Sequence, residues 1–426
     1  MGCRRHEKVM KAVVFTLGCK VNSCESASLI NGLESLGYET SDELSYADLY
    51  VINTCAVTAE AEKKSRQAIA RARKYNPDCE VIVTGCASEK SPDAFLKKNN
   101  VTLVTGAKSK DKILSMLKER GARLTEEDEY YEEYLPAKTE RERAFIKVQD
   151  GCDNFCSYCI IPYLRGRSRS RKRENVLKEI EYLAPSEAVL TGINLSDYDK
   201  NGDGLEGLIE MLRAVDCRIR LGSLEVNVIT TSFMQNLKNL KDFAPHFHLS
   251  LQSGSNAVLK SMNRHYDRDE YKRKCELIRA YFPTAAITTD IVVGYSTETE
   301  EDFADSVSLA EEIGFADVHC FPYSRREGTV GARLKELPPQ VKNERMRVMT
   351  EVKNKLKKAF IERNIGSIAE FIPEEKIDGY SVGYSGNYIR CYVKGDVGKG
   401  KRAVKLVEPY ADGALAVLIE NGGDEK

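Results

Sequence analysis

Short apolar runs that alternate with helical stretches constrain the fold of this chain more than any other feature of its sequence. Across residues 10–120 the alternation is typical of a parallel α/β sheet. It continues across residues 143–335, where six βα units predict an open, partial version of the eight-stranded barrel. Functional residues in such folds lie at the carboxyl ends of the strands. The six strand-like runs are 144–149, 187–193, 217–224, 246–251, 286–293 and 316–323.

Three apolar runs of the first domain end directly before a cysteine. Cys19, Cys55 and Cys86, here called the strand-end cysteines, are separated by 36 and 31 residues, and each separation fits one βα unit. Because the carboxyl ends of parallel strands share one edge of a sheet, the three thiols can converge on one site. Cysteine is also a common small core residue, so the runs alone leave both interpretations open.

A loop directly after the first barrel strand carries three more cysteines. Cys152, Cys156 and Cys159, here called the loop cysteines, offer the soft thiolates that iron–sulfur clusters use as ligands. A missing fourth thiolate would leave one iron with an open position. A structural zinc ion normally takes four ligands, and no further His or Cys lies nearby. The spacing therefore favours an iron–sulfur cluster over a zinc site, a disulfide group or free core cysteines.

Composition narrows the setting in which the chain works. The 64 Lys and Arg residues nearly balance the 65 Asp and Glu residues, so net charge argues neither for nor against a nucleic-acid partner. The 13 cysteines are unevenly spaced and no apolar export segment is present, which predicts a cytoplasmic location and metal ligation. No run approaches the ~18 apolar residues that a membrane-spanning helix needs, so we expect no membrane partner.

Local charge is less even. Six basic residues fall within nine positions from Arg165 to Arg173, directly after the loop cysteines, and Arg325 follows the last barrel strand. A surface cluster of Lys and Arg is usually a solvated face, but arginine also pairs bidentately with phosphate or carboxylate. Because these runs flank the predicted site, we expect Arg165, Arg167 and Arg325 to contact an anionic substrate.

The remaining segments predict a linker, a helix and a small β domain. Residues 121–142 are rich in acids and predict an interdomain linker. Residues 336–365 predict a connecting helix, and residues 366–422 show a period of two with closely spaced turns, which predicts a small closed β-barrel. Its aromatic and basic residues suit stacking on unpaired bases, although tyrosine is also ordinary in strands. These residues are Tyr380, Tyr384, Tyr388, Arg390 and Tyr392.

The cysteine loop resembles the signature of radical S-adenosylmethionine enzymes, C-x3-C-x-(aromatic)-C after a strand. The whole chain resembles the methylthiotransferases, which combine an N-terminal three-cysteine domain, a radical S-adenosylmethionine barrel and a C-terminal TRAM barrel. The resemblance implies two 4Fe-4S clusters, one on the loop cysteines and a second on the strand-end cysteines. The segments that carry it are Thr16–Asn22 (TLGCKVN), Asn53–Thr58 (NTCAVT), Val83–Cys86 (VTGC), Leu251–Ser255 (LQSGS), Met262–Arg264 (MNR) and Tyr323–Thr329 (YSRREGT).

The chemistry that this resemblance implies uses S-adenosylmethionine twice. One molecule donates a methyl group to sulfur at the second cluster, and another is cleaved reductively at the first to give a radical that abstracts a substrate hydrogen. A C–H bond thereby becomes C–S–CH3, so the two cysteine sets must face each other across a domain interface. Cofactor contacts are expected from residues at the barrel strand ends and in the loop, namely Tyr158, Thr191, Gly192, Glu225, Gln252 and Asp290.

Within the family, the motifs resemble those of tRNA enzymes acting on N6-threonylcarbamoyladenosine beside the anticodon. Ser250 stands where many relatives acting on isopentenyladenosine have proline. The expected partners are the tRNA anticodon stem-loop and an electron donor such as flavodoxin or ferredoxin. Methylthiolation of isopentenyladenosine, or of an aspartate in a ribosomal protein, stays open, as does a non-catalytic iron–sulfur RNA-binding redox sensor. Two segments depart from the family pattern, Gly294–Glu298 and Val226, and both lie near the predicted cofactor.

Overall fold

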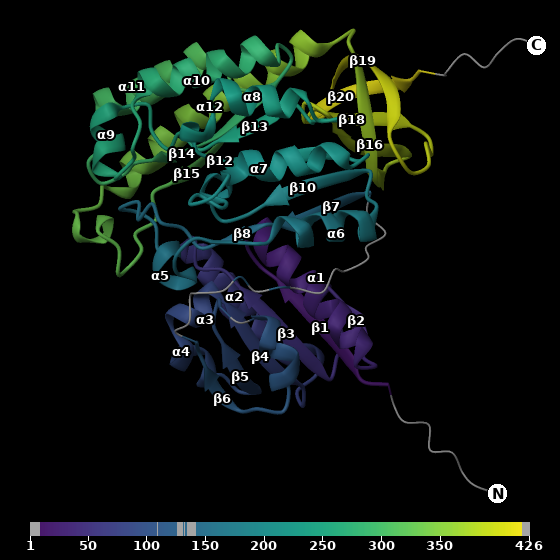
Figure 1. Ribbon diagram of the computed structural model, residues 1–426. Coiled ribbons are helices and arrows are strands. Elements are labelled where there is room, and N and C mark those ends of the chain that lie inside the picture. The colour runs from purple at the N-terminus through teal and green to yellow at the C-terminus, as the bar shows by residue number, and fades with distance from the viewer. Residues whose placement is uncertain (1–8, 109, 126–130, 132, 134–141, 420–426) are drawn as a thin grey trace, which may run out of the picture.

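The computed structural model describes residues 9–108, 110–125, 131, 133 and 142–419. It confirms the fold class predicted from the sequence: an N-terminal parallel α/β sheet, a central open barrel of parallel strands, and a small closed β-barrel. In Figure 1 the N-terminal domain lies below the central barrel, and the small barrel lies at the upper right. Most of the acidic segment predicted as a linker lies outside the described residues.

The N-terminal sheet has six parallel strands in the order β2-β1-β3-β4-β5-β6. Its central strands are nearly continuous apolar runs because helices cover both faces, and every residue of β3 is buried. Strand β6 falls within the segment predicted as a linker, so the sheet extends beyond residue 120. The strands are β1 (Lys11–Thr16), β2 (Glu39–Ser41), β3 (Leu49–Thr54), β4 (Glu80–Gly85), β5 (Val101–Thr105) and β6 (Gly121–Arg123).

Two separate apolar clusters show how the helices cover this sheet. Leu29 and Leu33 pack on one face, with Ile113 of a 3-10 helix beside them. Ala68 and Ile69 pack on the other face. The helices are α1 (Lys20–Ser35), α2 (Ala59–Tyr75), α3 (Cys86–Lys90) and α4 (Pro92–Leu96), and the 3-10 helix is Lys110–Met116.

The central barrel is an open wall of six parallel strands, the third of which is broken at Gly222. Its first part, β11, pairs with β10, and its second part, β12, pairs with β13. A Cβ atom at residue 222 would lie 2.9 Å from the carbonyl oxygen of Leu190, so the close approach of the two strands requires glycine here. The strands are β7 (Arg143–Lys147), β10 (Glu187–Thr191), β11 (Arg218–Leu221), β12 (Ser223–Leu224), β13 (His246–Leu249), β14 (Ala286–Val293) and β15 (Asp317–Pro322), and a short hairpin adds β8 (Gln149–Asp150) and β9 (Arg169–Ser170).

Side chains alternate between the two faces of this wall. The outward residues, such as Ile146 and Leu190, are apolar and pack under the surrounding helices in one extensive core. Many inward residues are polar or charged, such as Arg143, Glu187 and Asp290, so the lumen differs from a filled apolar core. The helices are α5 (Ile161–Arg165), α6 (Arg173–Leu183), α7 (Gly204–Met211), α8 (Thr231–Lys238), α9 (Asn256–Ser261), α10 (Arg268–Tyr281) and α11 (Glu300–Ile313).

A long helix, α12 (Pro339–Asn364), connects the two barrels (Figure 1). Met349, Leu356 and Phe360 are buried on one side of it, whereas Lys355 and Lys358 are exposed. None of the helices in the described parts of the chain is both long and apolar enough to cross a membrane.

The small barrel closes in the strand order β16-β17-β18-β20-β19 and docks on the amino end of the central barrel. Tyr388 stacks on His246 with 4.3 Å between ring centroids, and Tyr384 stacks on Tyr388 at 4.6 Å. Arg143 pairs with Glu374 across the same boundary at 2.6 Å. Two of the tyrosines that the sequence offered for base stacking therefore form a domain interface. The strands are β16 (Ile368–Ile377), β17 (Tyr380–Ser385), β18 (Arg390–Lys394), β19 (Arg402–Tyr410) and β20 (Gly413–Leu418).

Candidate active site

The loop cysteines lie between β8 and α5, at the carboxyl end of the central barrel. Backbone hydrogen bonds hold the loop: the N–H of Cys152 donates to the carbonyl of Gly166 at 3.2 Å, and that of Ser157 donates to the carbonyl of Met262 at 3.0 Å. Cys156 is buried, and the other two loop cysteines are partly exposed. The loop thus has a fixed path and presents its thiols at the mouth of the barrel.

Two polar side chains lie against the loop thiols. Nη1 of Arg264 is 3.2 Å from Sγ of Cys156, and Nδ2 of Asn194 is 3.9 Å from Sγ of Cys152. Such donors stabilise a thiolate more than a thiol. Arg264 also forms an ion pair with Glu225, which directly follows β12. Neither Arg264 nor Asn194 stands out in the sequence as a site residue, apart from the place of Arg264 in the MNR segment.

The donor set of the loop fits an iron–sulfur cluster. Burial raises the pKa of the Cys152 and Cys159 thiols to about 12, so a metal must displace their protons in order to bind thiolates. Among the described residues, no three His, Cys, Asp or Glu side chains are grouped closely enough to hold a single metal ion. A cluster distributes its soft thiolate ligands over separate irons, so three thiols on one loop suit a cluster better than a single ion.

The turn after β14 braces this loop. The hydroxyl of Tyr295 lies 2.8 Å from the hydroxyl of Ser157 in the loop. The carboxylate of Glu298 accepts hydrogen bonds from the N–H of Gly294 at 2.9 Å and from Arg345 at 2.6 Å. This turn, Gly294–Glu298, is one of the two places where the sequence departs from the family pattern. Its tyrosine hydroxyl makes a contact that a phenylalanine could not make, so the turn still supports the loop.

The strand-end cysteines lie at the carboxyl ends of the neighbouring strands β1, β3 and β4. Cys19 is the exposed N-cap of α1, whereas Cys55 and Cys86 are buried. Gly18 packs so closely on Cys55 that a Cβ atom there would lie 2.8 Å from the Cys55 Cβ. Burial, with the neighbouring thiols of Cys86 and Cys19, raises the pKa of Cys55 to about 11. The three thiols are therefore within electrostatic range of one another.

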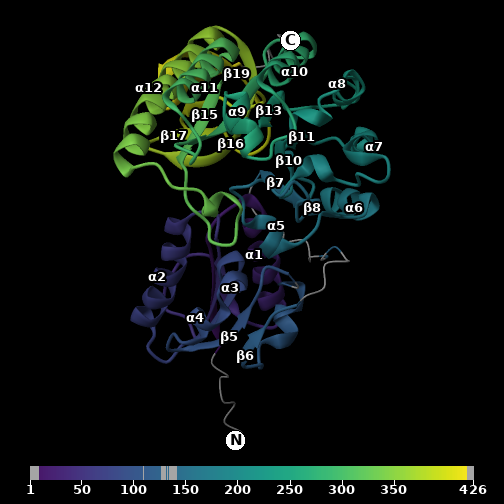
Figure 2. The ribbon, with the colours of Figure 1, turned by 90° about the vertical axis from the view of Figure 1, so that its left-hand side faces the viewer.

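The two cysteine sets face the same domain interface. Cys86 packs in one apolar cluster with Ile160 and Leu164, which follow the loop cysteines directly. Beyond the last barrel strand, Arg326 donates a hydrogen bond to the carbonyl of Ala56, next to Cys55, at 3.0 Å. Figure 2 shows the green segment after β15 reaching down to the N-terminal domain. The N-terminal strand ends therefore face the carboxyl end of the barrel.

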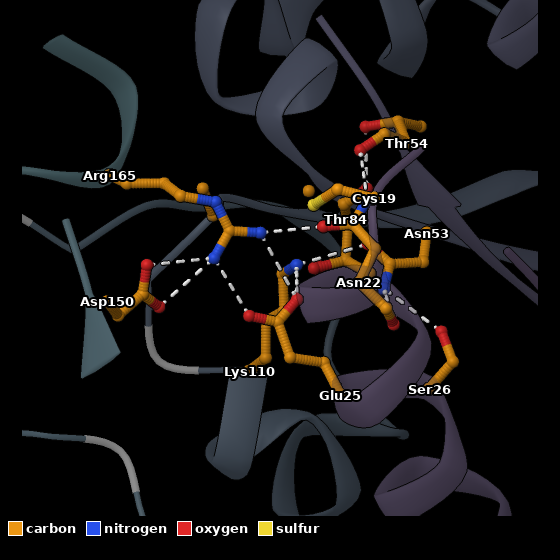
Figure 3. Close-up of polar contacts among 12 residues, drawn as sticks. Cys19, Asn22, Glu25, Ser26, Asn53, Thr54, Thr84, Lys110, Asp150 and Arg165 are labelled. Atoms are coloured by element: carbon orange, nitrogen blue, oxygen red, sulfur yellow. Dashed lines mark hydrogen bonds and ion pairs between the residues drawn. The ribbon is translucent and has the colours of Figure 1, made fainter. Parts of the chain in front are cut away.

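A buried network of ion pairs joins the two domains beside Cys19 (Figure 3). Glu25 of α1 is fully buried and pairs with Lys110, with Lys147 at 2.9 Å and with Arg165 at 2.9 Å. Asp150 pairs with Lys147 at 2.7 Å and with Arg165 at 3.0 Å. Burial disfavours ionised Glu25, but Arg165 and the two lysines outweigh that effect and hold its pKa well below the usual range. Removing one partner would leave a buried charge uncompensated, so the network fixes how the domains meet.

Arg165 is not the exposed substrate contact that the sequence predicted. Its side chain is 1% exposed, and its guanidinium is bound to the carboxylates of the network and to Oδ1 of Asn22 at 2.6 Å. The sequence shows the charge of Arg165 but not its burial. Arg325 is exposed, and 67% of the Arg167 side chain is exposed, with its guanidinium 4.7 Å from the ring of Phe155.

The residues predicted to contact the cofactor gather around the mouth of the barrel. Gln252 has a left-handed backbone with a φ of 69°, and it is held by backbone hydrogen bonds to Asp290 and Val292. A left-handed residue other than glycine is strained, and such strain concentrates at functional sites. Asp290 pairs with His248 at 3.2 Å, one layer below the strand ends. The remaining members of the set are Tyr158 in the loop, Thr191 and Gly192 at the end of β10, and Glu225 after β12.

Comparisons with known proteins match both halves of this arrangement. Residues 11–106 match the uncharacterized protein family UPF0004, and residues 146–310 match the Radical SAM superfamily. Threonylcarbamoyladenosine tRNA methylthiotransferase MtaB of Bacillus subtilis (strain 168) is 35% identical over 97% of this chain and 98% of its own length. The protein of that name from Aquifex aeolicus (strain VF5) is 37% identical over 84% of this chain and 91% of its own length. A tRNA-2-methylthio-N(6)-dimethylallyladenosine synthase of Caldicellulosiruptor saccharolyticus is 34% identical over 86% of this chain and 82% of its own length.

Solved structures share the fold at low identity. TsrM from Kitasatospora setae, a radical S-adenosylmethionine methyltransferase with cobalamin and a 4Fe-4S cluster bound, is similar with a TM-score of 0.55. It is 14% identical, and the match covers 88% of this chain and 81% of TsrM. At 14% identity the similarity shows a shared fold and nothing further.

Proposed function

Because this chain belongs to the radical S-adenosylmethionine methylthiotransferases, and is therefore a transferase, we propose that its substrate is N6-threonylcarbamoyladenosine beside a tRNA anticodon. The product is the 2-methylthio derivative, in which a C–H bond of the base has become C–S–CH3. The observation that carries the proposal is that both cysteine sets face one interface, because this reaction needs its sulfur and its radical source at the same carbon. The B. subtilis and A. aeolicus relatives named for this substrate support the choice.

An iron–sulfur cluster and S-adenosylmethionine belong to this family, and we assign a second 4Fe-4S cluster to the strand-end cysteines. When bound, these groups supply reductive cleavage, sulfur and the methyl group. The chain's own residues hold the thiolates and orient what binds. Arg264 and Asn194 donate hydrogen bonds to loop sulfurs, and the buried pairs of Glu25 hold the two sets in register. The position of Cys19, Cys55 and Cys86 at the ends of three neighbouring strands supports this assignment.

Cofactor and substrate contacts follow from the positions of the mouth residues. We assign S-adenosylmethionine to six residues in the loop and at the mouth of the barrel: Tyr158, Thr191, Gly192, Glu225, Gln252 and Asp290. Arg167 and Arg325 are exposed cations near the rim of the same mouth, and we assign them to phosphates of the anticodon stem-loop. The reaction also needs an external electron donor of the flavodoxin or ferredoxin class.

Isopentenyladenosine in tRNA is the second candidate substrate. The relative from C. saccharolyticus, 34% identical, carries a name for that class, so identity alone separates the two weakly. Chemically the substituents differ above all in charge, because the threonylcarbamoyl group carries a carboxylate and the isopentenyl group is apolar. The relatives named for threonylcarbamoyladenosine therefore carry the choice of substrate here.

Mass spectrometry of tRNA nucleosides tests the proposal. A strain lacking this protein should lose 2-methylthio-N6-threonylcarbamoyladenosine and accumulate its unmodified precursor, and the wild-type gene should restore the product. Loss of the isopentenyl derivative instead would assign the second substrate. Unchanged tRNA would leave the ribosomal-protein aspartate as the target.

Anaerobic reconstitution separates the enzyme from an iron–sulfur redox sensor that only binds RNA. The enzyme should hold about eight irons per chain, the content of two 4Fe-4S clusters, and form 5′-deoxyadenosine on reduction. A protein with four irons and no 5′-deoxyadenosine would fit the sensor and contradict the proposal.

A further inference from the structure

The inward side chains of the central barrel surround a space that we call the barrel chamber. Its walls include Phe145, Asp290 and His319, and its floor is formed by Tyr388 of the small barrel. Strands β7 and β15 do not pair, so the wall is open between them, and α1 of the N-terminal domain lies against β7. Beside the floor, a hollow of about 200 Å³ lies between α12, the amino ends of β14 and β15 and the small barrel, where His319, Phe360 and Tyr388 are among its lining residues.

Lys20 enters this chamber from the N-terminal domain. It is the first residue of α1 and follows Cys19 directly. Its Nζ lies 5.8 Å from the ring centroid of Phe145, and Glu187 and Tyr388 on the floor side lie within electrostatic range. Its side chain remains accessible to solvent. Within the described ranges no carboxylate forms an ion pair with it.

The carboxylates of the chamber floor already have arginine partners. Glu187 accepts Arg143 at 2.8 Å and Arg220 at 2.7 Å, and Arg218 lies 3.8 Å from it. The small barrel contributes Glu374, which pairs with Arg143 at 2.6 Å. Because arginines already pair with the carboxylates at the chamber floor, Lys20 remains there as an unpaired cation.

Two buried hydrogen-bonding atoms at the same floor also lack partners. Nη2 of Arg143 and Nδ1 of His246 have none among the described residues, although the two side chains are only 7% and 5% exposed. A buried polar atom without a partner is costly unless water or a ligand meets it. Among these groups only the ammonium of Lys20 is accessible, and an accessible, unpaired cation favours an anionic ligand.

We propose that the barrel chamber receives the carboxylate of the substrate's N6 substituent and that Lys20 is its ion-pair partner. This rests on the proposed function, which supplies a substrate with a carboxylate. An apolar substituent would leave Lys20 desolvated and unpaired, so the same residue also discriminates against isopentenyladenosine. S-adenosylmethionine carries a carboxylate too. We assign Lys20 to the substrate because it comes from the domain of the strand-end cysteines, next to Cys19.

Equilibrium binding tests the proposal without any chemistry. Reconstituted enzyme, without reductant or S-adenosylmethionine, is titrated with anticodon stem-loops that carry threonylcarbamoyladenosine or plain adenosine. Lys20→Gln should weaken binding of the first RNA roughly 10- to 100-fold and of the second less than about twofold, the range for losing a charged hydrogen bond. Lys20→Arg keeps the charge and should retain most of the preference. Lys98→Gln, an exposed lysine before β5 at the opposite edge of the sheet, should change neither affinity.

Other outcomes overturn the proposal. An equal loss for both RNAs, or an unchanged preference in Lys20→Gln, excludes the ion pair with the substrate. An increased KM for S-adenosylmethionine in 5′-deoxyadenosine formation, with the RNA preference kept, would assign Lys20 to the cofactor instead. Iron content reports whether the neighbouring cluster survives. If Lys20→Gln loses iron, Lys20→Met, which lacks the charge, is compared with Lys20→Arg, which keeps it. If these two variants bind the modified RNA with equal affinity, the proposal is overturned. If wild-type enzyme methylthiolates threonylcarbamoyladenosine while the variants keep the preference, only this inference fails.

Discussion

The two cysteine sets reach one interface by different routes. The loop cysteines lie within residues 152–159, and the backbone of one loop holds them. The strand-end cysteines stretch from Cys19 to Cys86, and three neighbouring strands of a sheet bring them together. A loop site depends on the few side chains around it, whereas a site at a sheet edge depends on the folding and docking of a whole domain. The second set should therefore respond more strongly to changes in domain packing.

The largest expected effect separates the two sets by reaction. Replacing all three loop cysteines by alanine should abolish 5′-deoxyadenosine formation, because the radical-generating cluster loses its ligands. Replacing all three strand-end cysteines should abolish the methylthio product and leave 5′-deoxyadenosine formation measurable. Each triple variant should keep about half of the wild-type iron. Product analysis by mass spectrometry and an iron assay check this, and loss of both activities in the strand-end variant would contradict separate roles.

Glu25→Gln should affect both sets, because Glu25 joins the domains that carry them. Breaking a buried ion-pair network by removing one partner costs about 3 kcal/mol or more in the free energy of unfolding. The folded-state pKa of Glu25 is lowered, so its contribution is present above the unfolded pKa of about 4.3 and is lost as the pH falls below it. The difference between wild type and variant should thus shrink below about pH 4.

Denaturant unfolding at neutral and acidic pH measures this difference. Glu34→Gln is the matched control, since Glu34 is exposed on the same helix and should change the free energy of unfolding by less than about 0.5 kcal/mol. A difference for Glu25→Gln that stays constant with pH would show that charge is not what the network uses.

Arg264→Lys should act on the loop set alone. The lysine keeps the charge but not the forked donors that reach Cys156 and Glu225 together. Residues just outside a metal's ligands typically alter activity 10- to 100-fold, so we expect 5′-deoxyadenosine formation to slow about 10-fold at unchanged iron content. Arg268→Lys, which alters a partly exposed ion pair with Asp305, is the control. An equal loss in both variants would point to destabilisation of the barrel.

Gly18→Ala should have the smallest effect, confined to the strand-end set. Gly18 has a φ of 106° and packs on Cys55, so a methyl group adds both backbone strain and a clash. We expect partial loss of iron with 5′-deoxyadenosine formation retained. Gly37→Ala is the matched control, because Gly37 has a φ of 89° but open space around it. If both variants lose iron equally, strain alone explains the effect.

The features that the sequence predicted correctly are those set by residues close together along the chain. The loop cysteines, the three strand ends and the turns of the small barrel are patterns within a few residues, and the fold class followed from them. The direction of parallel strands then implied that the strand-end cysteines lie on one edge. That inference needed only the topology, and the structure agrees with it.

Long-range burial could not be read from the sequence. Arg165 belongs to a basic run and was expected at a substrate, yet its partner Glu25 lies 140 residues away in another domain. Tyr388 was expected to stack on bases, but it stacks on His246. Arg264 was overlooked as a neighbour of Cys156, from which it is 108 residues distant in sequence. In each case the partner is set by domain docking, which no local pattern encodes.

If the two proposals hold, helix α1 carries a cluster ligand, a substrate contact and a domain contact on one rigid element. Its N-cap is Cys19, its first residue is Lys20, and Glu25 follows less than two turns later. At 1.5 Å per residue these groups lie within about 9 Å along the axis. A domain taken from a relative would therefore bring its sulfur ligand, its contact to the substituent and its docking charge as one unit. In chimeras of such enzymes, sulfur transfer and substrate preference should be inherited together.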